Sequence, residues 1–210
     1  MKLTIVGGGG FRVPQIIEVL ARARAGAGPH AQLIVDHVAL HDTAPSRLRA
    51  MKAVLTALDY PCPPAVSSHT DLDEALAGAD FVFSAMRVGG TRGRVLDERC
   101  ALEEGLLGQE TVGVGGYAYA LRTLGPALDL ARAVRRAAPG AWVINFTNPA
   151  GIITQAMRSV LGRRVVGICD APISLVRRTC AALGLDPSAA ERSGTGTDFD
   201  YVGLNHLGWL

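Results

Sequence analysis

The chain has 210 residues, of which 49% are hydrophobic and 19% are charged, and its formal net charge is +2. That length suffices for one α/β domain with a sizeable core, or for one domain and the start of another. The small net charge argues against nucleic acid as the main partner. No apolar run approaches the roughly 18 residues that a membrane-spanning helix needs, so we expect no membrane partner either.

Two features of the sequence bear on location. Four cysteines (Cys62, Cys100, Cys169 and Cys180) are spread along the chain without a CxxC pair, so we expect reduced thiols and no disulfide framework. Residues 1–6 carry one Lys and a short apolar run that ends in four glycines, which is typical of a strand and not of an export signal. Both features predict a cytoplasmic protein.

Short apolar runs alternate with helical segments along the chain. Strands are predicted at residues 3–6, 38–40, 65–68, 80–85, 141–146, 164–168 and 200–204, and helices at residues 14–25, 45–58, 72–77, 95–104, 117–137, 149–161 and 173–183. Alternation of this kind is typical of a parallel sheet with crossover helices. The predicted fold class is therefore α/β, with a Rossmann-type, doubly wound, mostly parallel sheet.

Polar or glycine-rich clusters follow five of these strands. They are residues 7–10, Asp42, residues 87–90, residues 145–148 and the pair Cys169 and Asp170. Because ligands of open parallel sheets bind outside the carboxyl ends of the strands, we expect these clusters to form one site.

The first cluster predicts a dinucleotide site. A Gly-rich turn between a first strand and a helix lets backbone amides approach a pyrophosphate. Gly7, Gly8, Gly9 and Gly10 provide such a turn, although Arg12 stands at the third glycine of the GxGxxG pattern. Asp42, after the second strand, suits the ribose hydroxyls and favours NAD over NADP. Asp42 also fits a second interpretation, as the N-cap of the helix that follows.

Cys169 and His206 are candidate metal ligands. Each fits a purely structural role as well, because single Cys and His side chains are often buried or hydrogen-bonded without further function. However, both follow predicted strands, and a thiolate and an imidazole can hold a divalent ion that a substrate's oxygens complete.

Other polar residues in these loops suit a substrate. Amides in the stretch 145–149 can bind sugar hydroxyls or the nicotinamide ribose, or can cap the next helix. Arg87, with Arg92 and Arg94 nearby, can fork onto a phosphate or remain solvated. Glu110 lies in a loop that is unusually rich in glycine.

Taken together, these segments resemble glycoside hydrolase family 4. The stretches that carry the resemblance are GGGGFRVP (7–14), MRVGG (86–90), LDE (96–98), GLLGQETVGVGG (105–116), NFTNPAGI (145–152), GICDAP (167–172) and GLNHLGW (203–209). Members of this family use NAD and usually Mn²⁺ to hydrolyse glycosides by a redox route, outside the usual two-carboxylate scheme. The resemblance implies hydride removal from C3 of the sugar, loss of the C2 proton, elimination of the aglycone, addition of water and return of the hydride.

The resemblance also implies residue roles. The residues expected to hold NAD are Gly7, Gly8, Gly9, Gly10, Phe11, Arg12 and Asp42. Cys169 and His206 would hold Mn²⁺ or another divalent metal, and Asp170 would act as general acid. Arg87, Asn148 and Glu110 would contact a phosphorylated glycoside, with Glu110 near the metal. Asp170 is typical of α-specific members, whereas the opening and the final HLGW favour 6-phospho-β-glucosidases, and we favour β.

Family members are longer, and the Tyr that removes the C2 proton lies in their second half. We therefore interpret residues 1–198 as an NAD-binding Rossmann-like domain and residues 199–210 as the start of a substrate- and metal-binding part. This chain would then be the N-terminal half of a larger two-part enzyme, inactive alone, and the full-length form a possible homo-oligomer. Two alternatives stay open: an oxidoreductase related to lactate or malate dehydrogenase, and a non-catalytic NAD-binding module.

Overall fold

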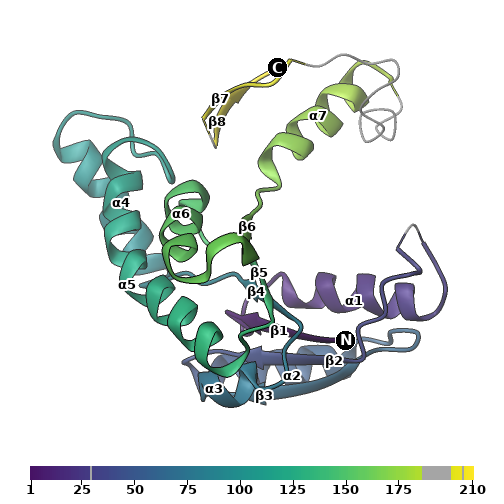
Figure 1. Cartoon of the computed structure of the whole chain (residues 1–210). Coiled ribbons are helices and arrows are strands. Elements are labelled where there is room, and N and C mark those ends of the chain that lie inside the picture. The colour runs from purple at the N-terminus through teal and green to yellow at the C-terminus, as the bar shows by residue number, and fades with distance from the viewer. Residues whose placement is uncertain (29, 186–199, 205) are drawn as a thin grey trace.

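The computed structural model describes residues 1–28, 30–185, 200–204 and 206–210 (Figure 1). Six strands form one parallel sheet in the order β3-β2-β1-β4-β5-β6. These strands are β1 (Lys2–Val6), β2 (His37–His41), β3 (Ala65–His69), β4 (Phe81–Ser84), β5 (Trp142–Asn145) and β6 (Val165–Gly167). The strand order reverses direction beside β1, which makes the sheet doubly wound and confirms the predicted fold class.

The helices of the described residues are α1 (Val13–Arg24), α2 (Pro45–Ala57), α3 (Leu72–Leu76), α4 (Gly90–Glu103), α5 (Gly113–Ala137), α6 (Ala150–Leu161) and α7 (Ala171–Ala182), and a 3-10 turn, η1 (Gly162–Arg164), precedes β6. Five of them cover the two faces of the sheet, while α4 packs on α5 and α7 extends away from the sheet (Figure 1). One core cluster joins the sheet to α3, α5 and α6, and a second joins it to α1 and α2. In Figure 1, α5 and α6 accordingly stand on the opposite side of the sheet from α1.

The larger core cluster shows why the long helix α5 forms. Small and branched apolar residues recur along one side of α5 and meet Val82 and Val143 of the sheet and Ile153 of α6. Leu130, at the centre of that side, is 1% exposed, whereas Leu121 on the same helix is 73% exposed. Burial of this apolar stripe, not helix propensity alone, therefore holds α5 in place.

We expect Leu130→Ala to lower the free energy of unfolding by about 2–5 kcal/mol, because the change removes buried methyl groups and leaves a cavity. The matched variant Leu121→Ala, exposed on the same helix, should change it by no more than about 0.5 kcal/mol. Urea unfolding of both variants followed by circular dichroism tests this core, and equal effects of the two changes would contradict it.

The strands agree with the sequence prediction to within about two residues, but two helices begin earlier than expected. Helix α4 begins at Gly90, not at residue 95, and α5 begins at Gly113, not at residue 117. Glycines near both starts had suggested a loop. The structure shows instead that Gly93, Gly115 and Gly116 lie inside these helices, where neighbouring residues pack too close for a Cβ.

The end of the chain forms an antiparallel hairpin of β7 (Val202–Leu204) and β8 (Leu207–Trp209), of which only the first strand was predicted. His206 lies in its turn with a positive φ of 62°. The predicted domain boundary at residues 198 and 199 lies outside the described residues, as does Asn205, and stays a prediction.

Two findings bear on the chemical setting of the chain. Cys62, Cys100, Cys169 and Cys180 are free, and the expected reduced state stays a prediction. Within the part of the chain that the structure describes, no helix is both long and apolar enough to span a bilayer.

Candidate active site

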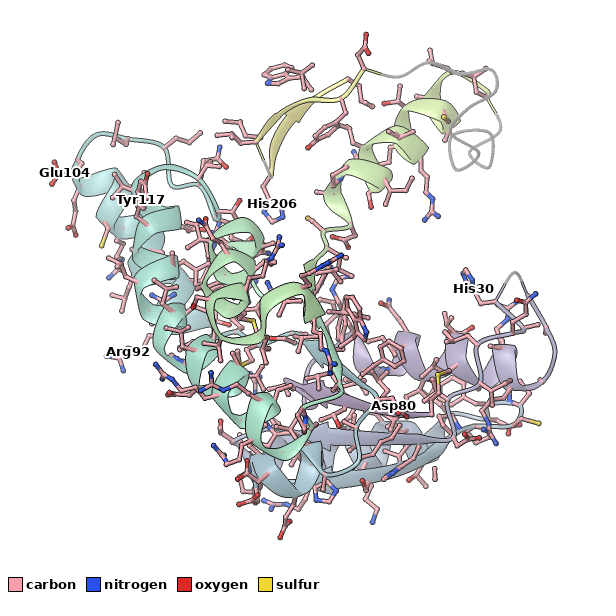
Figure 2. The ribbon with its side chains drawn as sticks, in the orientation of Figure 1. His30, Asp80, Arg92, Glu104, Tyr117 and His206 are labelled. Atoms are coloured by element: carbon pink, nitrogen blue, oxygen red, sulfur yellow. The ribbon has the colours of Figure 1, made fainter. Side chains whose placement is uncertain are left out.

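All six parallel strands point the same way, so the clusters predicted after their carboxyl ends do share one edge of the sheet. The β7–β8 hairpin brings His206 to this edge from far along the chain. Figure 2 shows His206 at the tip of the hairpin, directed toward the Rossmann domain.

The glycine turn after β1 is closed by its own hydrogen bonds. The amides of Gly7 and Gly8 both donate to the carbonyl of His41, at 2.9 and 2.7 Å, and the amide of Gly10 donates to the carbonyl of Gly7. The amides that follow, those of Phe11 and Arg12, stand where α1 begins and where a helix offers N–H groups to an anion. A pyrophosphate is therefore expected to bind at these two amides and not at those of the four glycines.

The glycines are required because backbone passes too close for a side chain. A Cβ on Gly7, whose φ is +95°, would lie 2.5 Å from the carbonyl oxygen of Ala85, and one on Gly8 would lie 2.8 Å from Cβ of Leu40. Atoms that close would force the β1–α1 turn away from the neighbouring strands. The turn thus packs tightly over the sheet edge, as dinucleotide binding requires.

Asp42 holds this turn in place. Its Oδ2 accepts the amide of Gly9 at 3.1 Å and its Oδ1 accepts the amide of Ala44 at 3.0 Å. The N-cap interpretation was wrong, because the N-cap of α2 is Ala44, two residues further along the chain. A carboxylate has further lone pairs, so Asp42 still has the acceptors that ribose hydroxyls need.

The neighbouring His41 is buried, and its Nδ1 has no partner among the described residues. Burial lowers the pKa of its imidazole below the ordinary 6.5. The imidazole therefore binds a proton more readily in the unfolded chain than in the folded one. As the pH falls through the pKa that His41 has in the unfolded chain, the free energy of unfolding decreases.

We expect the wild-type chain to lose more unfolding free energy between pH 7.5 and pH 5.5 than a His41→Gln variant does. His30→Gln, which changes an exposed histidine, is the matched control and should follow the wild type. Urea unfolding at the two pH values measures the difference, and an identical pH dependence of His41→Gln and wild type would refute this origin of acid sensitivity.

Arg12 joins the glycine turn to the other side of the sheet edge. Its guanidinium lies 3.1 Å from Oδ2 of Asp170, and its Cζ lies 4.9 Å from the ring centroid of Phe146. Phe146 in turn stacks on Phe83. The predicted NAD-binding Arg12 and the predicted general acid Asp170 are thus in direct contact, while Phe11 beside them is largely exposed.

Cys169 and His206 come together as predicted. Sγ of Cys169 lies 3.5 Å from Nε2 of His206, and the amide of Ala171 at the start of α7 donates to the same sulfur at 3.4 Å. Two ligand atoms of one metal ion, at roughly 2.0–2.3 Å from it and at a tetrahedral angle, stand roughly 3.5 Å apart. The thiolate and imidazole pair therefore fits a shared divalent ion.

No third protein ligand completes this pair within the described ranges: no group of three His, Cys, Asp or Glu side chains there is arranged to hold a metal ion. Glu110 instead lies behind His206, with Oε2 3.4 Å from Nδ1. A carboxylate at this place fixes the tautomer and ring orientation of a ligating histidine. An ion at the pair would keep positions for the oxygens of a bound molecule.

Arg87 holds Glu110 from the other side. One of its terminal nitrogens donates to Oε1 of Glu110 at 2.8 Å, and its guanidinium lies over the ring of Tyr119, 5.8 Å from the centroid. Arg87 is about half exposed and keeps donors for a substrate. Arg94 pairs with Glu98 instead, at 2.7 Å. In Figure 2, Arg92 points away from the side where His206 lies, so neither joins Arg87 in a phosphate fork.

The loop after β5 is tied together by its own amides and hydroxyls. Asn145 is fully buried, and its amide nitrogen donates to the carbonyl of Thr147 and to the hydroxyl of Thr154. Its side chain therefore stabilises the loop and is not exposed to a substrate. Asn148 precedes a cis peptide bond to Pro149, and its Oδ1 accepts the amide of Ala150 at 3.3 Å. Asn148 is thus not the N-cap of α6, which is Pro149, and its bond to Ala150 closes the turn before the helix. Substrate contact by the amide nitrogen of Asn148 stays a prediction.

A cavity of about 660 Å³ opens beside Cys169, between α6 and the end of β6. It is lined by Ala150, Gly151, Thr154, Gln155, Arg158, Gly167, Ile168 and Cys169. This space, with a guanidinium and an amide in its wall, is adjacent to the Cys169 thiol and is large enough for a monosaccharide phosphate.

Comparison with known proteins places the chain in a family. The family described as "Family 4 glycosyl hydrolase" matches residues 2–185. The phospho-alpha-glucosidase PagL of Clostridium acetobutylicum is 32% identical over all of this chain and 45% of its own length. A "probable 6-phospho-beta-glucosidase" of Bacillus subtilis is 32% identical over 99% of this chain and 45% of its own length.

A solved structure agrees with this placement. The 6-phospho-alpha-glucosidase from gut microorganisms, in complex with NAD and Mn²⁺, superposes with a TM-score of 0.80 at 32% identity, over 99% of this chain and 45% of its own. This chain thus spans less than half the length of the relatives it matches. On these residues, this order of motifs and this fold, the chain belongs to glycoside hydrolase family 4 and not to the lactate and malate dehydrogenases.

Proposed function

We propose that the protein containing this chain hydrolyses 6-phosphoglucosides with the help of NAD and a divalent metal ion, Mn²⁺ or a similar ion. One observation carries the proposal: the Cys169 and His206 pair, spaced for one ion, lies at the same sheet edge as the glycine turn. A simple NAD-dependent dehydrogenase has no need of a thiolate at this place. Relatives named as a phospho-alpha-glucosidase and a probable 6-phospho-beta-glucosidase, and a solved structure with NAD and Mn²⁺, support the same proposal.

When bound, NAD supplies reversible hydride transfer, and a divalent ion supplies charge stabilisation for sugar oxygens. The chain's own residues provide the positions. Asp42 and the α1 N-terminus would hold the two ends of the adenosine diphosphate moiety. Cys169 Sγ and His206 Nε2 would hold the metal, with Glu110 fixing the imidazole through Nδ1.

Two arginines prepare the site for a phosphorylated sugar. Arg87 presents a guanidinium next to Glu110, where it can bind substrate oxygens in forked geometry. Arg12 meets Asp170 at 3.1 Å, so it can orient the carboxyl group that would donate a proton to the leaving oxygen. Asn148, at the start of α6, would contact a sugar hydroxyl.

Several finer points remain part of the proposal. We favour β-linked substrates because the opening GGGGFRVP and the final HLGW resemble β-type members. α-Linked substrates are the alternative, since relatives with both names match this chain at 32% identity. The free cysteines support a reducing, cytoplasmic location. The low net charge supports a small-molecule partner without nucleic acid or membrane contact, and homo-oligomers are expected of the full-length form.

Sequential calorimetric titration of NAD, Mn²⁺ and glucose 6-phosphate into this chain tests the proposal under reducing conditions. We expect NAD to bind first and glucose 6-phosphate to bind only when NAD and Mn²⁺ are both present. NAD binding that is indifferent to Mn²⁺ and to glucose 6-phosphate would favour the non-catalytic module. Oxidation of a 2-hydroxy acid with net NADH release would favour the dehydrogenase alternative.

A further inference from the structure

A partly buried ion pair between α4 and α5 lies behind the candidate site. The carboxylate of Asp97 is 2% exposed, and Arg122 donates from both terminal nitrogens, one to each carboxylate oxygen, at 2.5 Å. The hydrogen bond to Asp97 also raises the pKa of Arg122. Such a forked pair fixes the orientation of both side chains.

Arg122 also forms a hydrogen bond with the loop that carries Arg87. Its Nε donates to the carbonyl of Val88 at 3.0 Å. A Cβ built on Gly89 or on Gly93 would lie 3.0 Å from the Arg122 side chain. Because these two residues have no Cβ, the guanidinium of Arg122 can pack directly against the 86–90 loop and the first turn of α4.

From Arg122 the contacts run to the candidate metal ligand. The guanidinium of Arg122 lies 5.3 Å from the ring centroid of Tyr119, and that of Arg87 lies 5.8 Å from the same centroid. Arg87 holds Oε1 of Glu110, and Glu110 faces Nδ1 of His206. Every link is a direct contact between side chains.

The loop that carries Glu110 is held against the same helices. A Cβ on Gly115 would lie 2.6 Å from the carbonyl oxygen of Gln109 and 3.1 Å from that of Asp97, and one on Gly116 would lie 2.5 Å from the carbonyl carbon of Thr111. The first turn of α5 thus packs directly on the Glu110 loop and on the backbone of Asp97.

We infer that Asp97 and Arg122 are positioning residues, which fix Arg87 and Glu110 and, through Glu110, the imidazole of His206. The inference rests on the proposed function, because it assigns the pair to the metal and substrate site. An ion pair removed from water adds little net stability compared with apolar residues of the same volume, and this pair is only partly buried. Its geometric value here is that it ties the 86–90 loop to the 105–112 loop and to the start of α5, which follows that loop directly.

Two variants disturb the pair in different ways. Arg122→Lys keeps the positive charge but removes the fork and the bond from Nε to Val88. Gly93→Ala keeps both charged residues but places a Cβ against the guanidinium. Two matched controls complete the set: Arg132→Lys changes an exposed arginine of α5 paired with Asp129, and Gly140→Ala adds a Cβ 3.9 Å from Arg164.

Hydrogen–deuterium exchange is measured for all four variants, together with NAD and Mn²⁺ affinity by calorimetry. We expect both Arg122→Lys and Gly93→Ala to exchange faster in residues 86–90 and 105–112 alone. Both should bind Mn²⁺ about two- to fivefold more weakly, which is less than the roughly tenfold loss typical of a residue that contacts a metal ligand directly. NAD affinity should stay unchanged, because the glycine turn does not contact the pair. Both controls should match the wild type in every measurement.

Three results would overturn the inference: unchanged exchange in these two loops, a loss of protection throughout the domain, or loosened loops with wild-type Mn²⁺ affinity. The first two results would show that Asp97 and Arg122 do not order the loops selectively. The third would show that they do not position the metal site. A wild-type chain that binds NAD but no Mn²⁺ contradicts the proposed function instead. The exchange measurement still decides whether the pair orders the two loops.

Discussion

Replacing Cys169 by Ser is expected to weaken Mn²⁺ binding at least about tenfold, since even residues around metal ligands typically contribute ten- to a hundredfold. The hydroxyl of Ser keeps the size of the side chain but does not ionise to a thiolate ligand at neutral pH. NAD affinity should not change, because Cys169 contacts His206 and Ala171 and not the glycine turn.

Cys100→Ser is the matched control, because Cys100 is exposed on α4 and should bind Mn²⁺ like the wild type. Calorimetric titration of Mn²⁺ into both NAD-loaded variants under reducing conditions makes the comparison. If Cys169→Ser and Cys100→Ser bind Mn²⁺ equally well, the metal lies elsewhere and the assignment of Cys169 fails.

Gly8→Ala is expected to lower NAD affinity by roughly ten- to a hundredfold, which corresponds to about 1.4–2.8 kcal/mol. The new Cβ would lie 2.8 Å from Cβ of Leu40 and 2.9 Å from the amide nitrogen of His41, where strand β2 cannot give way cheaply. The turn must therefore rise from the sheet edge, and the amides of Phe11 and Arg12 move with it.

Gly140→Ala serves as the control for an added methyl group far from the turn. Fluorescence or calorimetric titration of NAD measures the affinity, and urea unfolding shows that Gly8→Ala is still folded. A folded Gly8→Ala chain with wild-type NAD affinity would mean that NAD does not approach this turn.

The strands and the shared sheet edge could be predicted because buried parallel strands leave a direct mark in the sequence. Most of them are short apolar runs that end in polar or glycine residues, whereas the edge strand β3 (AVSSH) is mostly exposed and gives a weaker signal. The starts of α4 and α5 could not be predicted this way. Gly93, Gly115 and Gly116 lie inside helices, where glycine is intrinsically unfavourable. Their presence is explained only by the neighbouring side chain and carbonyl groups that pack where a Cβ would lie, and these contacts are not visible in the sequence.

The candidate site was predicted in its parts but not in its connections. The sequence predicts four site residues from their places in loops: Cys169, His206, Glu110 and Arg87. Their contacts with one another depend on the β7–β8 turn and on α5, which the sequence does not position. Asp97 and Arg122 were missed altogether, because a charged residue inside a helix usually faces solvent. One signal was available: Asp97 lies in the LDE stretch that carries the family resemblance, four residues after Gly93.

The central claim is that Cys169 and His206 share one metal ion beside the NAD site. Anomalous diffraction at the manganese edge, from crystals of this chain grown with NAD and Mn²⁺ under reducing conditions, tests it most directly. The account predicts an anomalous peak within bonding distance of both Cys169 Sγ and His206 Nε2, with Glu110 on the far side of the imidazole. A peak elsewhere, or NAD in its turn without any peak between these two atoms, would contradict it.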